Sequence, residues 1–173
     1  MIIYIFEFVN RIFYNGVKLY MNCRKKILFI LKKRSNYGPS FGLKNSCSFI
    51  CNSLSKIGIE CKVVEVLDNN SIDKEVFNYK PTHVVIEAYW VVPSKFDVLL
   101  PKYKNVFWTV RSHSKIPFFQ NESVCIEWTK GYNDIAQKYP NFSISSNTKG
   151  FVNPIEKTLD INVDYLPNIY EPP

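Results

Sequence analysis

The sequence lacks the motifs of several common nucleotide-binding and signalling proteins. It has no Gly-x-x-x-x-Gly-Lys-Ser/Thr, the loop with which P-loop hydrolases hold phosphates. No Gly-x-Gly-x-x-Gly follows the first apolar run, which argues against a dinucleotide oxidoreductase. At the end of that run, where a receiver domain would carry acidic residues, the chain has Lys32-Lys33-Arg34. These three classes of protein are therefore not expected.

The cysteines of the sequence form no Cys-x-x-Cys pair. The odd number of cysteines speaks against a disulfide framework, and their spacing speaks against a zinc site. Cys47 and Cys51 lie four residues apart on a helical face that also carries apolar residues, so we expect buried free thiols. A metal ion held by these two residues is the less favoured alternative, and no other metal site is implied. The five cysteines are Cys23, Cys47, Cys51, Cys61 and Cys125.

Long uninterrupted apolar runs are absent as well. Residues 1–20 are rich in Ile, Phe, Val and Tyr, but Glu7, Arg11 and Lys18 interrupt them, so no stretch is long enough to span a bilayer. The segment also lacks the basic start and small-residue cleavage site of a secretory signal. Three interpretations stay open: translated upstream sequence with the true start at Met21, an interfacial amphipathic segment, and an extra helix packed on the domain.

The apolar content that is present suffices for a core. Of 173 residues, 46% are hydrophobic, so one globular domain is expected rather than a disordered chain. The net charge of +7 suits nucleic acid, an anionic membrane surface or a phosphorylated small molecule. Apart from Arg24-Lys25-Lys26 and Lys32-Lys33-Arg34 the basic residues are scattered, as on an ordinary solvated surface. Charge therefore decides little about the partner.

Apolar runs, polar turns and helical periodicities alternate between Lys26 and Asn168. The apolar runs predict strands at 27–31, 61–67, 83–89, 106–110, 142–145 and 163–166. Helices are expected from Asn45–Ser46 to Gly58, at 72–79, between Pro93 and Pro101, and at 121–139, with a further one broken near Gly150 and Pro154. The pattern predicts an α/β fold with a single Rossmann-like, doubly wound, mainly parallel sheet and helices on both faces. Its ligand crevice should lie beyond the carboxyl ends of the strands, first of all at residues 34–44.

The order of these segments resembles a known family. The segments that carry the resemblance are Lys26-Ile27-Leu28-Phe29-Ile30, Cys61-Lys62-Val63-Val64-Glu65-Val66, Pro81-Thr82-His83-Val84-Val85-Ile86-Glu87, Phe107-Trp108-Thr109-Val110-Arg111-Ser112-His113 and Tyr165-Leu166-Pro167-Asn168. Together they resemble the N-terminal, acceptor-side domain of a GT-B glycosyltransferase of the glycosyltransferase 4 kind, over about residues 26–168. The resemblance implies an extension at 1–20, a Rossmann-like domain at 21–168 and the start of an interdomain linker at 169–173.

The resemblance also implies what the chain would need from elsewhere. The family's C-terminal domain, which holds the nucleotide-sugar, is missing, so the expected function is the acceptor-side half of a glycosyltransferase that is inactive alone. No cofactor is expected on this chain, and the nucleotide-sugar donor would bind the missing domain. The expected partners are a glycan or lipid acceptor and a separate chain that supplies the second domain. The loop from Asn36 to Gly42 departs from the family because it lacks a Gly-Gly pair.

Candidate site residues follow from the strand ends. Glycosyl transfer needs a base for the acceptor hydroxyl or a group that stabilises the departing phosphate, and His113 and Arg111 are the titratable and cationic candidates. The residues expected to contact the acceptor are Tyr37, Gly38, Ser40, Gly42, Glu87, Tyr89 and Trp90. Structural alternatives exist for each kind: a hydrogen-bonded His113, an Arg111 paired with Glu87, and aromatic residues that only cover the sheet edge.

Two other functions stay open. The chain could be a non-catalytic α/β module that binds a phosphorylated ligand or nucleic acid, although it shows no RNA or DNA recognition motif. It could also be a decayed remnant that folds without activity. The expected location is the cytoplasm. Peripheral contact with the inner face of a membrane is a further option.

Overall fold

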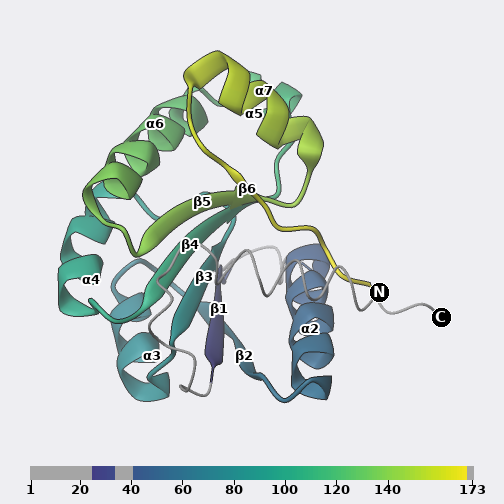
Figure 1. Ribbon diagram of the computed structural model, residues 1–173, viewed down its shortest axis with the longest axis vertical. Helices are drawn as coiled ribbons and strands as arrows, with labels where there is room; N and C mark the ends of the chain where they lie inside the picture. Colours follow the sequence, from purple (N-terminus) through teal and green to yellow (C-terminus); the bar gives the residue numbers. More distant parts are fainter. Residues whose placement is uncertain (1–24, 34–40, 171–173) are drawn as a thin grey trace. The chain divides into compact units, whose positions relative to one another are not determined.

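The computed structural model describes residues 25–33 and 41–170 (Figure 1). Six strands pair in the order β2-β1-β3-β4-β5-β6 in one parallel sheet, which confirms the predicted α/β, Rossmann-like fold. The chain divides into two compact units. The first ends at Val85 and includes the chain again from Asn168, and the second is Ile86–Pro167, so β3 (His83–Glu87) contributes residues to both.

In the first unit, helices cover both faces of a strand pair. β1 (Lys26–Lys32) and β2 (Glu60–Val66) are parallel, with Lys26 opposite Glu60 and Lys32 opposite Val66. Successive side chains of a strand point to opposite faces. On β2, Glu65 binds Lys44 of α2 (Phe41–Lys56) at 2.7 Å, and Lys62 binds Glu75 of α3 (Ser71–Tyr79) at 3.8 Å. The two helices therefore lie on opposite faces of these strands, as Figure 1 shows.

Helix α2 begins earlier than the sequence predicted. It begins at Phe41, so the prediction of a start at Asn45–Ser46 is wrong. Ser46 looks like a cap in sequence, but its side chain is buried and its hydroxyl donates to Oδ1 of Asn168 at 2.8 Å. The predicted end is correct: Gly58, at φ 82°, follows the last turn.

The cysteines of the described residues are free thiols, as expected. Cys47, Cys51 and Cys125 are buried, and Cys61 on β2 is half-buried. A hydrogen bond with the Cys51 thiol, together with burial, raises the pKa of Cys61. Cys61 is therefore a protonated, poorly nucleophilic thiol at neutral pH.

The second unit is built on three further parallel strands. β4 (Phe107–Ser112), β5 (Phe142–Ser146) and β6 (Asp164–Tyr165) pair with Arg111 opposite Ser145 and Ser145 opposite Asp164. The helical elements are the 3₁₀ turn η1 (Pro93–Lys95) and helices α4 (Phe96–Lys102), α5 (Ile116–Asn121), α6 (Ser123–Lys138) and α7 (Lys149–Leu159). The aromatic rings of the core pack edge-on or tilted, with centroids 4.7 to 6.2 Å apart, and come from Tyr89, Phe96, Trp108, Phe119, Tyr132, Phe142 and Phe151.

One helix prediction in this unit is confirmed and one is wrong. The helix expected at 121–139 is α6 to within two residues, and Glu122, at φ −118° and ψ 89°, separates it from α5, which was not predicted. The helix expected to break near Gly150 and Pro154 instead runs through both residues as α7. Thr148 caps α7 by accepting the Gly150 N–H. Burial of the apolar face of α7 outweighs the cost of Pro154 inside the helix. Pro101 likewise lies inside the last turn of α4.

Gly131 lies where α6 meets η1, and a side chain there would collide. A Cβ atom on Gly131 would lie 2.9 Å from Cγ and 3.0 Å from Cβ of Pro93. Alanine normally stabilises a helix by up to about 1 kcal/mol relative to glycine. Here overpacking of about 1–3 kcal/mol opposes that gain, so Gly131→Ala should lower the free energy of unfolding in urea.

The matched control is Gly42→Ala in α2, where a new Cβ would meet no atom within 4 Å. That variant should be as stable as the wild type or slightly more stable. A Gly131→Ala protein at least as stable as wild type would contradict the collision with Pro93.

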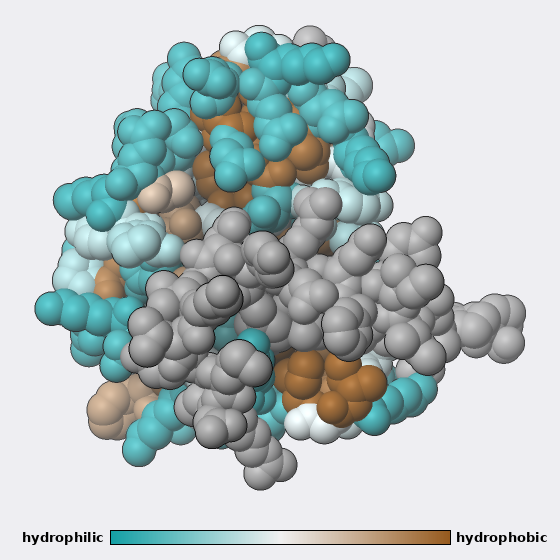
Figure 2. Space-filling model, in the orientation of Figure 1, coloured by the Kyte–Doolittle hydropathy of each residue, from teal (hydrophilic) through white to brown (hydrophobic). Residues whose placement is uncertain are grey.

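Apolar side chains are also present on the surface. In the view of Figure 2, hydrophilic residues predominate over the helices of the second unit, with apolar ones visible between them. Phe118, Val124 and Ile126, at the start of α5 and α6, are 49%, 41% and 37% exposed. In the portion of the chain that the structure describes, no helix has the length and apolar character needed to cross a bilayer.

Candidate functional site

Polar residues meet where β3 and β4 end. Glu87 is the last residue of β3, and Arg111 and His113 lie at the carboxyl end of β4. Ala88 donates its backbone N–H to the Arg111 carbonyl at 2.9 Å and has φ 69°, a region that non-glycine residues rarely adopt. The indole N–H of Trp90 donates to the Glu87 carbonyl at 3.0 Å. The backbone around Glu87 is thus tied to two neighbours and turned out of the strand, which ends β3 two residues before the predicted Tyr89.

The Arg111 and Glu87 side chains form a fully buried ion pair. Nη1 of Arg111 lies 3.1 Å from Oε1 and 3.4 Å from Oε2 of Glu87, and both side chains are 0% exposed. Nε of Arg111 donates to the Leu166 carbonyl at 3.0 Å. A buried charge is tolerated only when it is paired and hydrogen-bonded. The guanidinium is therefore committed to holding Glu87 and the segment after β6 in place.

The environment keeps Glu87 ionised. Burial raises the pKa of this carboxyl, but the nearby Arg111 charge and the hydrogen bond from His113 outweigh burial, so the pKa lies below its usual value. At neutral pH the carboxylate can only accept hydrogen bonds. The charged Glu87 is thus a fixed acceptor facing the imidazole of His113.

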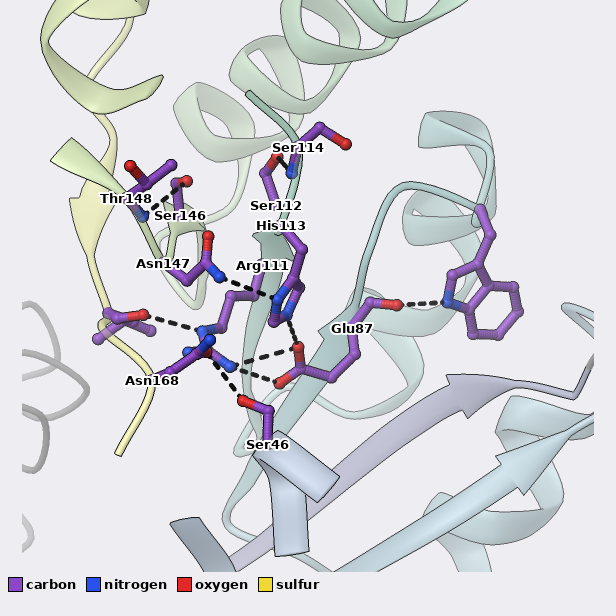
Figure 3. A network of polar contacts seen from close by, with 12 residues as sticks. Ser46, Glu87, Arg111, Ser112, His113, Ser114, Ser146, Asn147, Thr148 and Asn168 are labelled. Atoms are coloured by element: carbon purple, nitrogen blue, oxygen red, sulfur yellow. Dashed lines mark hydrogen bonds and ion pairs between the residues drawn. The ribbon is translucent and has the colours of Figure 1, made fainter. Parts of the chain in front are cut away.

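Both ring nitrogens of His113 have partners. Nε2 makes a short contact with Oε2 of Glu87, and Nδ1 lies 3.1 Å from Nδ2 of Asn147 (Figure 3). The His113 side chain is 14% exposed, whereas Glu87 is fully buried. A partly exposed imidazole oriented by a buried carboxylate is the arrangement by which enzymes position a general base.

Asn147 is held by the loop between β5 and α7. Its backbone N–H donates to the Ser112 carbonyl at 3.1 Å. On one side Ser146 accepts the Thr148 N–H at 3.3 Å, and on the other Ser112 accepts the Ser114 N–H at 3.3 Å (Figure 3). These hydroxyl-capped turns stiffen both loops, so Asn147 and His113 face each other on short, well-anchored segments.

The structure brings some of the predicted site residues together and places others elsewhere. Glu87, Arg111 and His113 are brought together, and Trp90 is bonded to the backbone of Glu87. Tyr89 packs edge-on against Phe119 and Tyr132, with ring centroids 5.4 and 5.0 Å away, as a residue of the aromatic core. Gly42 is an exposed residue in the first turn of α2, in the other unit. Tyr37, Gly38 and Ser40 lie outside the described residues.

Residues 38–42 also spell Gly-Pro-Ser-Phe-Gly, which matches the Gly-x-Ser-x-Gly pattern of serine hydrolases. In those enzymes the strand runs directly into a sharp elbow at the serine. Here β1 ends at Lys32, and five residues separate it from Gly38. The spacing therefore does not fit a nucleophile elbow.

Sequence reasoning missed Asn147 and the Leu166 carbonyl. Asn147 directly follows β5, and since parallel strands end at the same edge of a sheet, its position could have suggested a place near His113. The Leu166 carbonyl carries no signal in the sequence, because every residue has one. Within residues 25–33 and 41–170, no cluster of three or more His, Cys, Asp or Glu side chains is arranged to hold a metal ion.

Comparisons with known proteins add little to this geometry. No protein-family model matches the chain, and no curated protein matches it. One solved structure that it is similar to is a fragment of a presumed lipoprotein from Peptoclostridium difficile 630, at 16% identity, with a TM-score of 0.41 over 77% of this chain and 97% of that one. A likeness at that score carries no argument about fold or function.

Proposed function

We propose that the chain is the acceptor-side domain of a GT-B glycosyltransferase, with His113 as the general base for the acceptor hydroxyl. The observation that supports this is the contact of His113 with the buried, ionised Glu87 at the carboxyl ends of two adjacent parallel strands. Ligands of open parallel sheets bind at that edge. A carboxylate behind an imidazole stabilises the cation that forms when the ring takes a proton.

The chemistry assigns each group one task. The acceptor O–H bond breaks, the proton moves to His113, and the oxygen's electron pair bonds to the anomeric carbon of the sugar as the nucleoside diphosphate leaves. Glu87 orients the ring and balances its charge. Arg111 is fully buried, so in this proposal it positions Glu87 and does not contact the departing phosphate. The donor would bind a second domain, and this chain would bind no cofactor of its own.

The partners are a glycan or lipid acceptor and, where the donor domain is a separate chain, that chain. Trp90 is half-buried beside Glu87, and an aromatic face there suits a sugar ring. The proposed place of action is the cytoplasm, at or near the inner face of a membrane.

The test is binding of simple acceptors to the full chain. A panel of methyl glycosides is screened by saturation-transfer NMR, and at least one should bind. His113→Ala should weaken that binding by roughly tenfold, the value of one good hydrogen bond. The control is Gln137→Ala, which truncates an exposed polar side chain of α6 and should change nothing.

Salt separates this proposal from binding of nucleic acid. Glycoside affinity should hardly change between about 50 and about 200 mM salt, whereas a protein with several phosphate contacts loses on the order of a thousandfold. A panel without a single binder, or binding that survives His113→Ala, would refute the acceptor site. Salt-sensitive binding of an oligonucleotide would favour the binding-module alternative.

A further inference from the structure

We infer that Asn147 is a positioning residue for His113: its amide fixes the tautomer with the proton on Nε2 and covers the basic Nδ1 until an acceptor hydroxyl takes its place. The catalytic meaning of this step rests on the proposed function, whereas the tautomer does not.

The hydrogen-bond chain defines the tautomer. Glu87 is ionised and can only accept, so Nε2 of His113 must carry a proton to bond it. In the neutral ring the other nitrogen, Nδ1, then holds a lone pair. Nδ2 of Asn147, a donor, lies 3.1 Å from that nitrogen. Carboxylate, imidazole and amide therefore form one chain in which every donor faces an acceptor.

The side-chain N–H groups of Asn147, and not its side-chain carbonyl, explain the position of this residue. Its Oδ1 is buried and has no hydrogen-bond partner within the described part of the chain. A buried carbonyl left without a donor costs free energy. The backbone bond to Ser112 and the cap of α7 by Thr148 hold the residue in this place all the same. The Asn147 amide keeps this position although its carbonyl oxygen lacks a donor among the described residues. We attribute this to the hydrogen bond from its Nδ2 to Nδ1 of His113.

The consequence for the reaction concerns the order of events. Nδ1 is the nitrogen that can take the proton, and in the resting protein Asn147 occupies it. An acceptor hydroxyl donates to the same lone pair, so it replaces the amide as the hydrogen-bond donor. Proton transfer then breaks the acceptor O–H bond and forms N–H on Nδ1, while Nε2–H continues to bond Glu87. Water is kept from the base until an acceptor arrives.

The test uses the small number of histidines. His83 and His113 are the two histidines of the sequence, so a ¹⁵N-imidazole NMR spectrum contains two rings. In its neutral form the wild-type His113 ring should show an unprotonated Nδ1 and a protonated Nε2. Asn147→Asp replaces the donor by a group of the same size that can only accept, so Nδ1 should become protonated. His83 should keep its signals and thereby report that the fold is intact.

The control is Asn153→Asp, which makes the same chemical change on an exposed position of α7 and should leave both rings unchanged. A wild-type ring with its proton on Nδ1, or an Asn147→Asp ring with Nδ1 still unprotonated, would overturn the inference.

A second variant tests the replacement step. Asn147→Ala removes a group that the acceptor must displace. A glycoside that binds the wild type in the NMR screen should therefore bind this variant roughly two- to tenfold more tightly. Weaker binding by Asn147→Ala would refute replacement even if the tautomer is as stated. If Nδ1 becomes protonated in Asn147→Asp but no glycoside binds any form of the chain, the proposed function fails and the positioning role of Asn147 stands.

Discussion

Replacing Arg111 by methionine should cost about 3–5 kcal/mol of unfolding free energy, the usual effect of removing one partner from a buried ion pair. The variant leaves the carboxylate of Glu87 at 0% exposure without its guanidinium and the Leu166 carbonyl without its donor. Urea unfolding measures the loss, and for a chain of this size it corresponds to a melting temperature lower by roughly 10 °C.

Two comparisons make this result specific. Adding Glu87→Gln to Arg111→Met removes the unpaired charge, so the double variant should recover about half of the loss. Lys138→Met breaks the exposed ion pair with Asp97, whose side chains are 60% and 41% exposed, and should have no measurable effect. An Arg111→Met protein as stable as the Lys138→Met protein would show that the buried pair does not hold the site together.

Acid should destabilise the first unit through His83. Burial, aided by the charge of Lys25, lowers the pKa of His83 from 6.5 to about 3. Between these values the unfolded chain binds one more proton than the folded chain, so stability rises with pH and falls as acid is added. The slope is about 1.4 kcal/mol per pH unit, so roughly 2 kcal/mol should be lost between pH 6.5 and about pH 5.

The variant His83→Asn cannot take up this proton. Its unfolding free energy should change much less over the same range, although its stability at about pH 7.5 can differ from that of the wild type. The pH range of about 6.5 to about 5 is chosen to lie above the usual carboxyl pKa. Glu87, with its lowered pKa, contributes stability that is lost only in stronger acid, so it does not affect this comparison. Parallel curves for wild type and His83→Asn between pH 6.5 and 5 would contradict a buried, neutral His83.

Much of the fold could be predicted from local sequence. The apolar runs at 27–31 and 106–110 coincide with strands to within one or two residues, since a strand buried on both faces must be apolar along its length. The run at 61–67 coincides with β2 to within one residue, although β2 is only half-buried and carries charged residues. Errors arose where contacts distant in sequence outweigh a local signal. Ser46 reads as a helix cap but bonds Asn168, and Pro154 reads as a breaker but lies in a helix with a buried apolar face.

The candidate site was predictable only in part. Glu87, Arg111 and His113 could be named because they end strands, and one predicted alternative, the pairing of Arg111 with Glu87, is what the structure shows. The partner on the other side of His113 could not be named, because Asn147 is 34 residues away and meets the ring through the register of β4 against β5. No local pattern encodes that register.

By itself, the order of apolar runs and polar turns determined that this protein is a parallel α/β layer whose polar residues collect at the strand ends, because hydrophobic burial and strand geometry act on neighbours along the chain. Only the tertiary structure decided that Arg111 is a buried brace rather than an exposed cation, and that both nitrogens of His113 are occupied. Burial and hydrogen-bond partners depend on which segments meet in space, and that is set by the packing of the folded chain.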